Sequence, residues 1–336
     1  MTITVRTADE SLESWDDHLD SSPQATPFHQ AAGLRLLENH SGSTLHPLVG
    51  YKGEQPIGIL PVFEHQRGPF TMVDSPPKGC EVYYLGPAMF DVEQVKQRKF
   101  DRRNRQFING ALDWIDEHIS PDQTHIRTVD QYHDHRPFKD RGYDVSPYYT
   151  YVVDLTQDWD SLLMQFSSDA RSNVRNADES SYTIDRGSID DAKTIIGQVA
   201  DRHAEQGKAY HITEDFVESL LSTFPEGQVI PHTVRIDDEV VGGMITLEYG
   251  ETIYRWQGGA KPDVELPVND LLDAHIIQDA MERGLSRYDL VGANTPRLCR
   301  YKAKFAPDLR VYHGARKRSR RASLVSRVRR TMPIDV

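Results

Sequence analysis

The sequence predicts a mixed α/β fold in which one unit occurs twice. In each half, a strand hairpin is followed by a helix, a short strand and an aromatic residue next to a lysine. These matching pieces are the turns at 53–58 and 238–242, the helices 103–119 and 268–284, the strands 125–129 and 287–291, and the pairs Phe138-Lys139 and Tyr301-Lys302. The same elements recur in the same order in both halves, which indicates an internal duplication. Because there are only two copies and the repeat is long, the sequence does not predict a solenoid.

The first half alternates between strand and helix patterns. Residues 2–6 alternate like a strand, and Leu12, Trp15 and Leu19 follow at helical spacing after 9–11. The pattern then predicts a helix around 34–37, a hairpin over 45–65, a strand at 82–85, a helix over 94–119, and strands at 125–129 and 143–155.

The second half repeats this plan with insertions. It predicts a helix over 158–179, a strand near 182–184, helices near 189–206 and 213–223, a hairpin over 232–260, a helix over 268–284, and strands near 288–291 and 309–314. We therefore expect a first domain over 1–152, a second domain over 153–315 that carries the motifs, and a basic tail, disordered or amphipathic, over 316–336.

The chain of 336 residues has a formal net charge of −12, but this charge is unevenly distributed. Eight basic and no acidic residues lie between Arg316 and Arg330, so the remainder has 31 basic against 51 acidic residues, a net charge of −20. An acidic, lysine-poor body is typical of a halophilic composition. It argues against nucleic-acid binding over the whole surface, because domains that bind phosphate backbones are usually basic.

Two cysteines, Cys80 and Cys299, exclude a disulfide framework and metal motifs of the CxxC type. The run from Tyr132 to His135 offers two or three metal ligands without a second cluster, so we expect a polar loop and no metal. The N-terminus has no apolar segment of signal-peptide length, and no window reaches the roughly 18 apolar residues of a membrane span. We therefore expect a cytoplasmic protein.

The composition of the basic tail leaves two interpretations open. Leu324, Val325 and Val328 lie among its basic residues, so a helix here would present a basic amphipathic face to an anionic membrane surface. A disordered arm that contacts RNA, such as tRNA, has the same composition. The first interpretation predicts a peripheral position at the inner face of the membrane, with 316–330 as the contact.

Lysine is scarce, with 11 lysines against 28 arginines, yet Lys302 and Lys304 are only two residues apart. They follow the strand 288–291 and the polar run Gly292-Ala293-Asn294. In an extended segment, residues two apart lie on one face. Two ammonium groups past a strand end suit a phosphate or a developing oxyanion, and the alternative is a solvated loop.

Arg171 and Arg175 are four residues apart, which puts two guanidinium groups on one face of a helix. Such a pair can hold a phosphate or a carboxylate, and the alternative is an exposed helix.

Tyr254, Trp256 and Gln257 end a predicted strand before two glycines. Period two puts Tyr254 and Trp256 on one face, and Arg255 and Gln257 on the other. The aromatic face predicts either an acceptor pocket or a core position, and Gln257 is a candidate for a hydrogen bond to substrate.

Two polar residues at the ends of elements have two interpretations each. Asn269 begins the helix 268–284, where capping and substrate binding are both open. Asp289 lies in the strand before Gly292 and is a candidate base that takes a proton from an attacking ammonium group. The alternative for Asp289 is an ion pair with Arg297 or Arg300.

Four segments give these residues a common context: SDARSNVRNA (168–177), YRWQGGA (254–260), PVNDLL (267–272), and 288–292 with 302–305. In this order they resemble the Fem-type peptidyltransferases and the related BioF2-like acetyltransferase domain. The resemblance is strongest over 158–312. It implies two tandem GNAT-like domains, each a mixed, mostly antiparallel sheet flanked by helices.

The resemblance also implies an activity, acyl transfer to an amine, and hence an acyltransferase. The donor would be acyl-CoA, such as acetyl-CoA, or aminoacyl-tRNA, with no metal. Lys302 matches the Fem-type lysine that stabilises charge at the reacting centre, and Asp289 is the second catalytic candidate. The expected substrate-binding residues are Arg171, Arg175, Tyr254, Trp256, Gln257, Asn269, Asn294, Tyr301 and Lys304.

The sequence departs from the family pattern at the donor site. The run RxxGxA over 255–260 fits the GNAT pyrophosphate loop, but Pro262 and Pro267 follow it. No helix N-terminus therefore receives the phosphate directly.

We therefore expect an N-acyltransferase that takes part in cell envelope biogenesis. The acceptor would be an amine on a cell-surface polysaccharide or envelope precursor, as a small molecule or lipid-linked, and Lys302 would stabilise the oxyanion of direct attack. Two alternatives stay open. One is a peptidyltransferase that depends on aminoacyl-tRNA, and the other is a non-catalytic GNAT-like protein docked on membrane or RNA by its basic tail.

Overall fold

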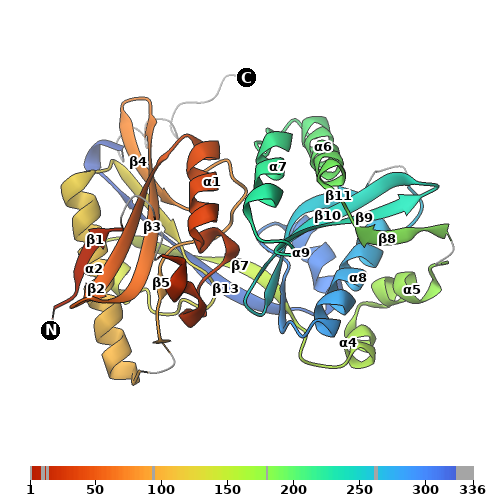
Figure 1. Cartoon of the computed structure of the whole chain (residues 1–336), viewed down its shortest axis with the longest axis horizontal. Helices are drawn as coiled ribbons and strands as arrows, with labels where there is room; N and C mark the ends of the chain where they lie inside the picture. The colour runs from red at the N-terminus through yellow and green to blue at the C-terminus, as the bar shows by residue number, and fades with distance from the viewer. Residues whose placement is uncertain are drawn as a thin grey trace. The chain divides into compact units, whose positions relative to one another are not determined.

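The computed structural model describes residues 2–8, 12, 15–92, 95–178, 181–260 and 264–322. The chain forms two compact units. The first comprises Met1–Lys78, Val82–Pro147 and Tyr312–Val336, and the second comprises Gly79–Glu81 and Tyr148–Val311. Each unit contains a sheet with helices on it (Figure 1). The expected mixed α/β fold is therefore confirmed.

The sheet of the first unit has the strand order β1-β2-β3-β4-β6-β13. These strands are β1 (Thr4–Thr7), β2 (Thr44–Lys52), β3 (Gln55–Arg67), β4 (Phe70–Ser75), β6 (Gln123–Arg127) and β13 (Asp308–Arg318). Neighbours are antiparallel except β4 and β6, which are parallel because helix α2 (Gln97–His118) carries the chain between them. A short strand, β5 (Ala88–Met89), pairs with β3.

Helix α2 covers this sheet with its apolar stripe. Phe107, Ala111, Leu112 and Ile115 are buried at helical spacing, and α2 packs against β1, β2 and β3. The unit also contains α1 (Ala31–Ser41), α3 (Arg136–Asp140) and the 3-10 helices η1 (Asp16–Ser21) and η2 (Pro27–His29).

The second unit repeats the plan strand for strand, in the order β8-β9-β10-β11-β12-β7. The parallel pair, β11 and β12, is again joined through a helix, α8 (Val268–Glu282). The strands are β8 (Thr183–Arg186), β9 (Val229–Ile236), β10 (Glu239–Tyr249), β11 (Thr252–Ala260), β12 (Arg287–Asp289) and β7 (Asp144–Asp154). The last strand of each unit, β13 or β7, comes from the other half of the sequence. The topology thus repeats as the duplication predicts, and the domain bounds 1–152 and 153–315 stay a prediction.

Helices cover both faces of the second sheet. Successive side chains of β10 point to opposite faces: a Cβ on Gly243 would meet Ile195 of α6 (Ile189–Glu205), whereas Met244 lies in a core cluster with Ile276 of α8. Helix α7 (Glu214–Thr223) packs on α6. Helices α6 and α7 therefore lie on one face, and α8 lies on the other.

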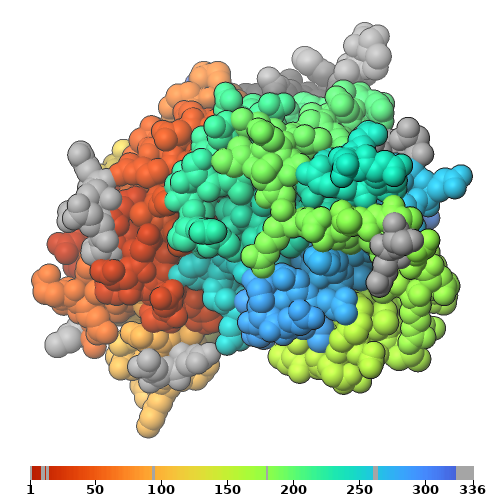
Figure 2. Space-filling view, turned by 45° about the vertical axis from the view of Figure 1, so that its right-hand side comes forward, coloured from red at the N-terminus to blue at the C-terminus, as the bar shows by residue number. Residues whose placement is uncertain are grey.

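The predicted single helix over 158–179 is wrong. The chain forms α4 (Trp159–Gln165) and α5 (Ser168–Asn176), because Phe166 is extended with ψ 153° and Ser167 caps a new helix by accepting a hydrogen bond from Ala170 N. Helix α5 packs against α8. Figure 2 shows the yellow-green α4–α5 segment at the surface beside the blue segment that contains α8.

The segment with the two lysines is helical, so the prediction of an extended segment is wrong. It forms α9 (Pro296–Lys302) and the 3-10 helix η5 (Ala303–Phe305). Pro296 at the first helical position favours this start.

The predicted strand at 82–85 is also wrong. Val82, Tyr84 and Leu85 are buried, but the segment is irregular, so burial alone explains its apolar residues. The strand that pairs with β3 and β6 is β4, which was not predicted. Residues 9–11 of the first predicted helix and 323–336 of the basic tail lie outside the described residues. None of the described helices has the length and apolar character needed to cross a membrane.

Gly243→Ala should destabilise the second unit, because the added Cβ would overlap Ile195 and lie 2.7 Å from His232 O. Overpacking of this kind typically costs about 1–3 kcal/mol. Gly197→Ala is the matched control. Gly197 lies within α6 with open space around such a Cβ, so alanine should raise the free energy of unfolding by roughly 0.5–1 kcal/mol. Urea unfolding measures both, and equal stabilities would contradict the packing of α6 on β10.

Candidate active site

The parallel strands β11 and β12 separate just before the segment that leads to Lys302. Their register ends at Tyr254 and Asp289, and the chain then turns through Val291 and Gly292 with φ values of 51° and 82°. A β-branched residue at positive φ is strained by roughly 1–3 kcal/mol, and such strain persists only where neighbours enforce it. Here Asp289 Oδ1 accepts from Val291 N at 2.8 Å and from Thr150 Oγ1 at 2.7 Å. These bonds fix the turn.

Lys302 reaches this turn from α9. Its side chain is 4% exposed, and its Nζ donates to Val291 O at 2.6 Å and to Gly292 O at 2.8 Å. Burial, reinforced by the charge of Arg255, lowers the pKa of Lys302 to about 7, although Asp289 acts in the opposite direction. An ammonium group has three donors, so one N–H is left for another acceptor. A fixed group that titrates near neutral pH is typical of functional sites.

A buried carboxylate holds the elements around Lys302 together. Asp273 of α8 accepts hydrogen bonds from Arg255 Nε at 2.9 Å, from Tyr288 OH at 2.6 Å and from Tyr301 OH at 2.6 Å. Burial acts to lower the pKa of Arg255, but Asp273 outweighs it and the pKa is raised. Burial and Asp273 raise the pKa of both tyrosines, which stay protonated donors. Arg255 is therefore committed to Asp273.

Lys304 has a different environment from Lys302. Its Nζ lies 2.8 Å from Asp169 and 3.2 Å from Asp270, and Asp270 also accepts a bond of 2.7 Å from Asn173 Nδ2. Burial opposes the charge of Lys304, but the two carboxylates outweigh it and raise its pKa. The two ammonium groups therefore do not share a face, and Lys304 joins α5 to α8.

A β-bulge redirects the side chains at the end of β11. Arg255 and Gln257 pair with consecutive residues of β10, so Trp256 is an extra residue in the ladder. Arg255 points to α8, whereas Gln257 accepts a hydrogen bond of 2.9 Å from Tyr210 OH, which follows α6. The prediction that Arg255 and Gln257 share a face is therefore wrong.

Two of the predicted binding residues make structural contacts. Trp256 is 7% exposed, donates from Nε1 to Glu81 O at 3.1 Å and lies near the ring of Phe216. The amide of Asn294 pairs with the backbone of Tyr149, accepting from its N at 2.9 Å and donating to its O at 3.1 Å. These contacts favour a positioning role for both residues.

Arg202 of α6 is a candidate that the sequence patterns missed. Its Nη2 donates to Gly258 O at 2.9 Å, and the guanidinium group covers Gly259 so closely that a Cβ there would overlap it. Burial, together with the charges of Arg255 and Arg297, lowers the pKa of Arg202. Asp273 offsets the charge of Arg255, so the positive charge that an anionic ligand would meet here belongs to Arg202 and Arg297.

The arginine pair of α5 lies on one helical face. Arg171 Nη1 donates to Met164 O at 2.8 Å, and Arg175 Nη2 lies 3.2 Å from Met164 Sδ. Asn269 lies in the first turn of α8 rather than at its cap, because the helix begins one residue earlier. Among the described residues, no group bonds its buried Oδ1. Capping therefore does not explain Asn269, and binding stays a prediction.

The predicted pyrophosphate segment is part of a strand. Gly258, Gly259 and Ala260 pair with successive residues of β10 and belong to β11. Within the described part of the chain, no three His, Cys, Asp or Glu side chains gather as a metal site would require.

Comparison with known proteins gives this geometry a context. Residues 165–303 match the family model described as acetyltransferase (GNAT) domain. A comparison with curated proteins finds no match. Among solved structures, FemX is 13% identical, over 92% of this chain and 96% of its own, with a TM-score of 0.70.

Two further solved structures are similar. The C-terminal domain of a proposed lysylphosphatidylglycerol synthetase from Agrobacterium fabrum is 13% identical, over 95% of both chains, with a TM-score of 0.60. A tandem GNAT protein from the clavulanic acid biosynthesis pathway is 10% identical, over 94% of this chain and 98% of its own, with a TM-score of 0.51. At these identities the likeness establishes a shared fold.

The predicted resemblance to Fem-type and tandem GNAT proteins is thereby confirmed as a fold of tandem GNAT-like units. The match to the acetyltransferase (GNAT) family model lies within the second unit. The expected acyltransferase class is confirmed at that level.

Lys302→Met should make folding stability less dependent on pH. The pKa of Lys302 is about 7 in the folded chain and about 10.4 in an unfolded one. Between these values the unfolded chain binds more protons, so wild-type stability should rise with pH, by up to about 1.4 kcal/mol per pH unit. Below pH 7 both states are protonated and the effect ends.

Urea unfolding at pH 7 and pH 9 measures this difference. The rise with pH should be smaller in Lys302→Met than in the wild type. The same rise in both proteins would contradict the low pKa.

Proposed function

We propose that this chain is an N-acyltransferase in which Lys302 stabilises the oxyanion formed when an amine attacks an activated acyl group. The observation that carries the proposal is the buried amine of Lys302, fixed at the strained turn of Val291 and Gly292. A donor held in a water-poor site stabilises a developing negative charge more strongly than a donor in water. The GNAT family model over 165–303 supports the same class of chemistry.

In the proposed reaction the acceptor nitrogen, as a free amine, attacks the acyl carbonyl carbon. The new C–N bond turns the carbonyl oxygen into an oxyanion, to which the third N–H of Lys302 donates. Collapse of this intermediate breaks the bond to the leaving group, a thiolate or a ribose oxygen. The acceptor nitrogen loses one proton and the leaving group gains one. With a pKa of about 7, Lys302 can give one proton to the leaving group and then take one from the acceptor nitrogen near neutral pH.

Asp289 acts in this proposal through the turn. Its hydrogen bonds to Val291 N and Thr150 Oγ1 support a positioning role. The assignment of Asp289 as the base stays a prediction from sequence.

Three arginines support the proposal that the acceptor or the donor carries an anionic group. Arg202, beside Gly259, has guanidinium neighbours, and Arg171 and Arg175 converge on Met164. Guanidinium groups bind phosphates and carboxylates with several hydrogen bonds at once. An amine on a phosphorylated precursor of a surface polysaccharide, or on another envelope precursor, combines the required nucleophile with such a group.

A second candidate function is aminoacyl transfer from tRNA. The donor segment favours it, because Arg255 is bound to Asp273 and residues 258–260 belong to β11. The RxxGxA pattern therefore does not offer the open loop that a CoA pyrophosphate would occupy. In the N-acyltransferase proposed first, the donor is acyl-CoA. An assay with each donor separates that function from aminoacyl transfer.

We further propose a cytoplasmic location with peripheral contact to the inner face of the membrane. The basic composition of 316–330 supports this position, because clustered basic residues are attracted to anionic lipids. A lipid-linked acceptor would be reached there.

Lys302→Met should reduce acyl transfer by on the order of 100-fold, because loss of one oxyanion donor costs about that much. Transfer is measured with radiolabelled acetyl-CoA and with alanyl-tRNA as donors, and with amino sugars and lysine-containing peptides as acceptors. Lys208→Met, an exposed lysine of the same unit, is the matched control and should transfer at the wild-type rate.

Unchanged transfer by Lys302→Met would refute the role of Lys302. Absence of transfer by the wild type with either donor would favour the non-catalytic binding protein. Transfer from alanyl-tRNA alone would establish the second candidate.

Arg202→Ala should raise KM for a phosphorylated amine about tenfold or more and change kcat little, because a hydrogen bond to a charged group contributes about 1.5–3 kcal/mol. The KM for the unphosphorylated amine should stay the same. Arg186→Ala, whose side chain is 54% exposed, is the control. An equal rise of KM for both amines would argue for a structural effect and against an anion site.

A further inference from the structure

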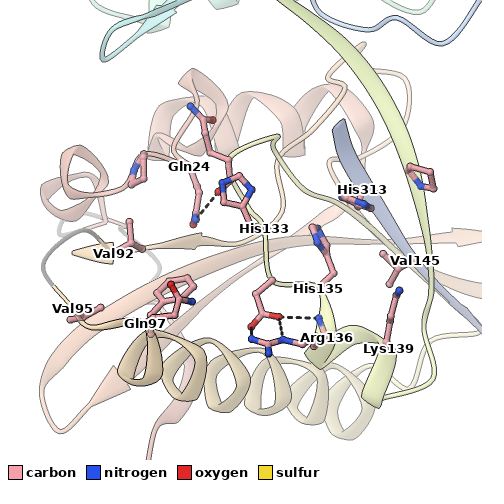
Figure 3. A pocket seen from close by; sticks show the side chains of 15 residues that line it. Gln24, Val92, Val95, Gln97, His133, His135, Arg136, Lys139, Val145 and His313 are labelled. Carbon is pink, nitrogen blue, oxygen red and sulfur yellow. Dashed lines mark hydrogen bonds and ion pairs between the residues drawn. The ribbon is translucent and has the colours of Figure 1, made fainter. Parts of the chain in front are cut away.

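The first unit contains a cavity of about 940 Å³ that the proposed function does not use. In Figure 3, Gln24 and His133 lie on one side of it, and His135, His313 and Lys139 lie on the other. Sites for small molecules typically measure about 300–1,000 Å³. The cavity therefore has room for an organic ligand.

The charged side chains in the lining of this cavity are Lys139, Arg136 and Asp134. His133, Arg136 and Lys139 are exposed there. Asp134 accepts from Arg136 Nε at 2.7 Å and from Arg136 Nη2 at 3.0 Å, and Asp101 lies 3.2 Å from Arg136 Nη2, so carboxylates offset the charge of Arg136. Among the described residues, no carboxylate pairs with Lys139. The charge of this lysine is therefore available to an anion.

Two histidines beside Lys139 are neutral at neutral pH. The rings of His135 and His313 lie 4.2 Å apart, and His135 Nε2 lies 3.0 Å from Thr128 Oγ1. Burial, together with His313, lowers the pKa of His135 to about 4, and burial together with Lys139 lowers the pKa of His313. An anion bound here would raise the pKa of both rings, because a nearby negative charge favours their protonated form.

Apolar side chains form another part of the lining. Phe100 of α2 and Pro23 contribute to it, and Val145 and Pro147 come from the start of β7. A ligand that fits both the cationic part and the apolar part of the lining has an anionic group attached to a flat or apolar body.

A basic surface on α2 lies next to the cavity. A separate hollow of about 690 Å³ is lined by five basic residues and one acid, Asp101; the basic residues are Lys96, Arg98, Lys99, Arg102 and Arg105. The N-terminal part of α2 lines the cavity as well. In a chain with a net charge of −12, such a cluster is a local exception that raises the concentration of anions near the cavity.

We propose that the cavity of the first unit binds a small organic phosphate, a phosphate group on a flat or apolar body. Lys139 and His133 contact the phosphate, and Phe100 and Pro147 contact the body. Phosphate fits better than carboxylate, because it has about twice the charge and three acceptor oxygens for the donors around it. The site is independent of acyl transfer at Lys302, so either proposal can fail alone.

Adenosine monophosphate is the probe for this site, measured by isothermal titration calorimetry on the full chain. It should bind about tenfold or more tightly than adenosine or inorganic phosphate, because each contacts only one part of the lining. Lys139→Ala should weaken this binding about tenfold or more. Lys99→Ala, on the basic surface outside the cavity, is the matched control and should bind like the wild type.

Three results would overturn the proposal. The first is an absence of binding to the wild type at millimolar adenosine monophosphate. The second is an equal loss in Lys139→Ala and Lys99→Ala, which would indicate attraction to the surface. The third is a loss in Arg202→Ala with none in Lys139→Ala, which would locate the nucleotide in the second unit. Equal unfolding midpoints establish that Lys139→Ala, altered at an exposed side chain, is folded.

Discussion

The buried pair of Arg255 and Asp273 is the interaction on which the candidate active site depends. Two charges leave water here, and the loss of hydration is offset because the carboxylate also accepts from Tyr288 and Tyr301. These residues come from β11, α8, β12 and α9, so one carboxylate joins the elements around Lys302. Loss of either charge would leave the other buried and unpaired, which typically costs about 3–5 kcal/mol.

The surroundings of the two neighbouring lysines explain why their pKa values shift in opposite directions. Lys302 has the carbonyl oxygens of Val291 and Gly292 as partners, and neutral carbonyls offset only part of the hydration that the buried amine loses. Lys304 lies between two carboxylates and keeps its charge. The strained backbone at Val291 points both carbonyls at the amine. The same turn therefore sets the position and the proton affinity of Lys302.

The duplicated fold could be predicted because hairpins, helices and short strands leave local patterns in the sequence. The faces to which the side chains of the site residues point could not be predicted. The bulge at Trp256 depends on pairing with β10, so period two alone gives the wrong face. The segment of Lys302 is too short to show helical periodicity. Arg202 left one weak signal, a charged residue three positions after buried Val199, where the apolar stripe of α6 continues.

The duplicated aromatic–lysine pair shows how one residue type acquires two properties. Phe138 and Lys139 of α3 correspond in sequence to Tyr301 and Lys302 of α9. The hydroxyl of Tyr301 reaches buried Asp273, whereas Phe138 has no hydroxyl and packs among aromatic rings. Phe138 therefore cannot make the hydrogen bond that joins α9 to a buried acid, and Lys139 beside it is exposed. Burial decides which copy holds an amine that titrates near pH 7 and which holds a cation open to an anionic ligand.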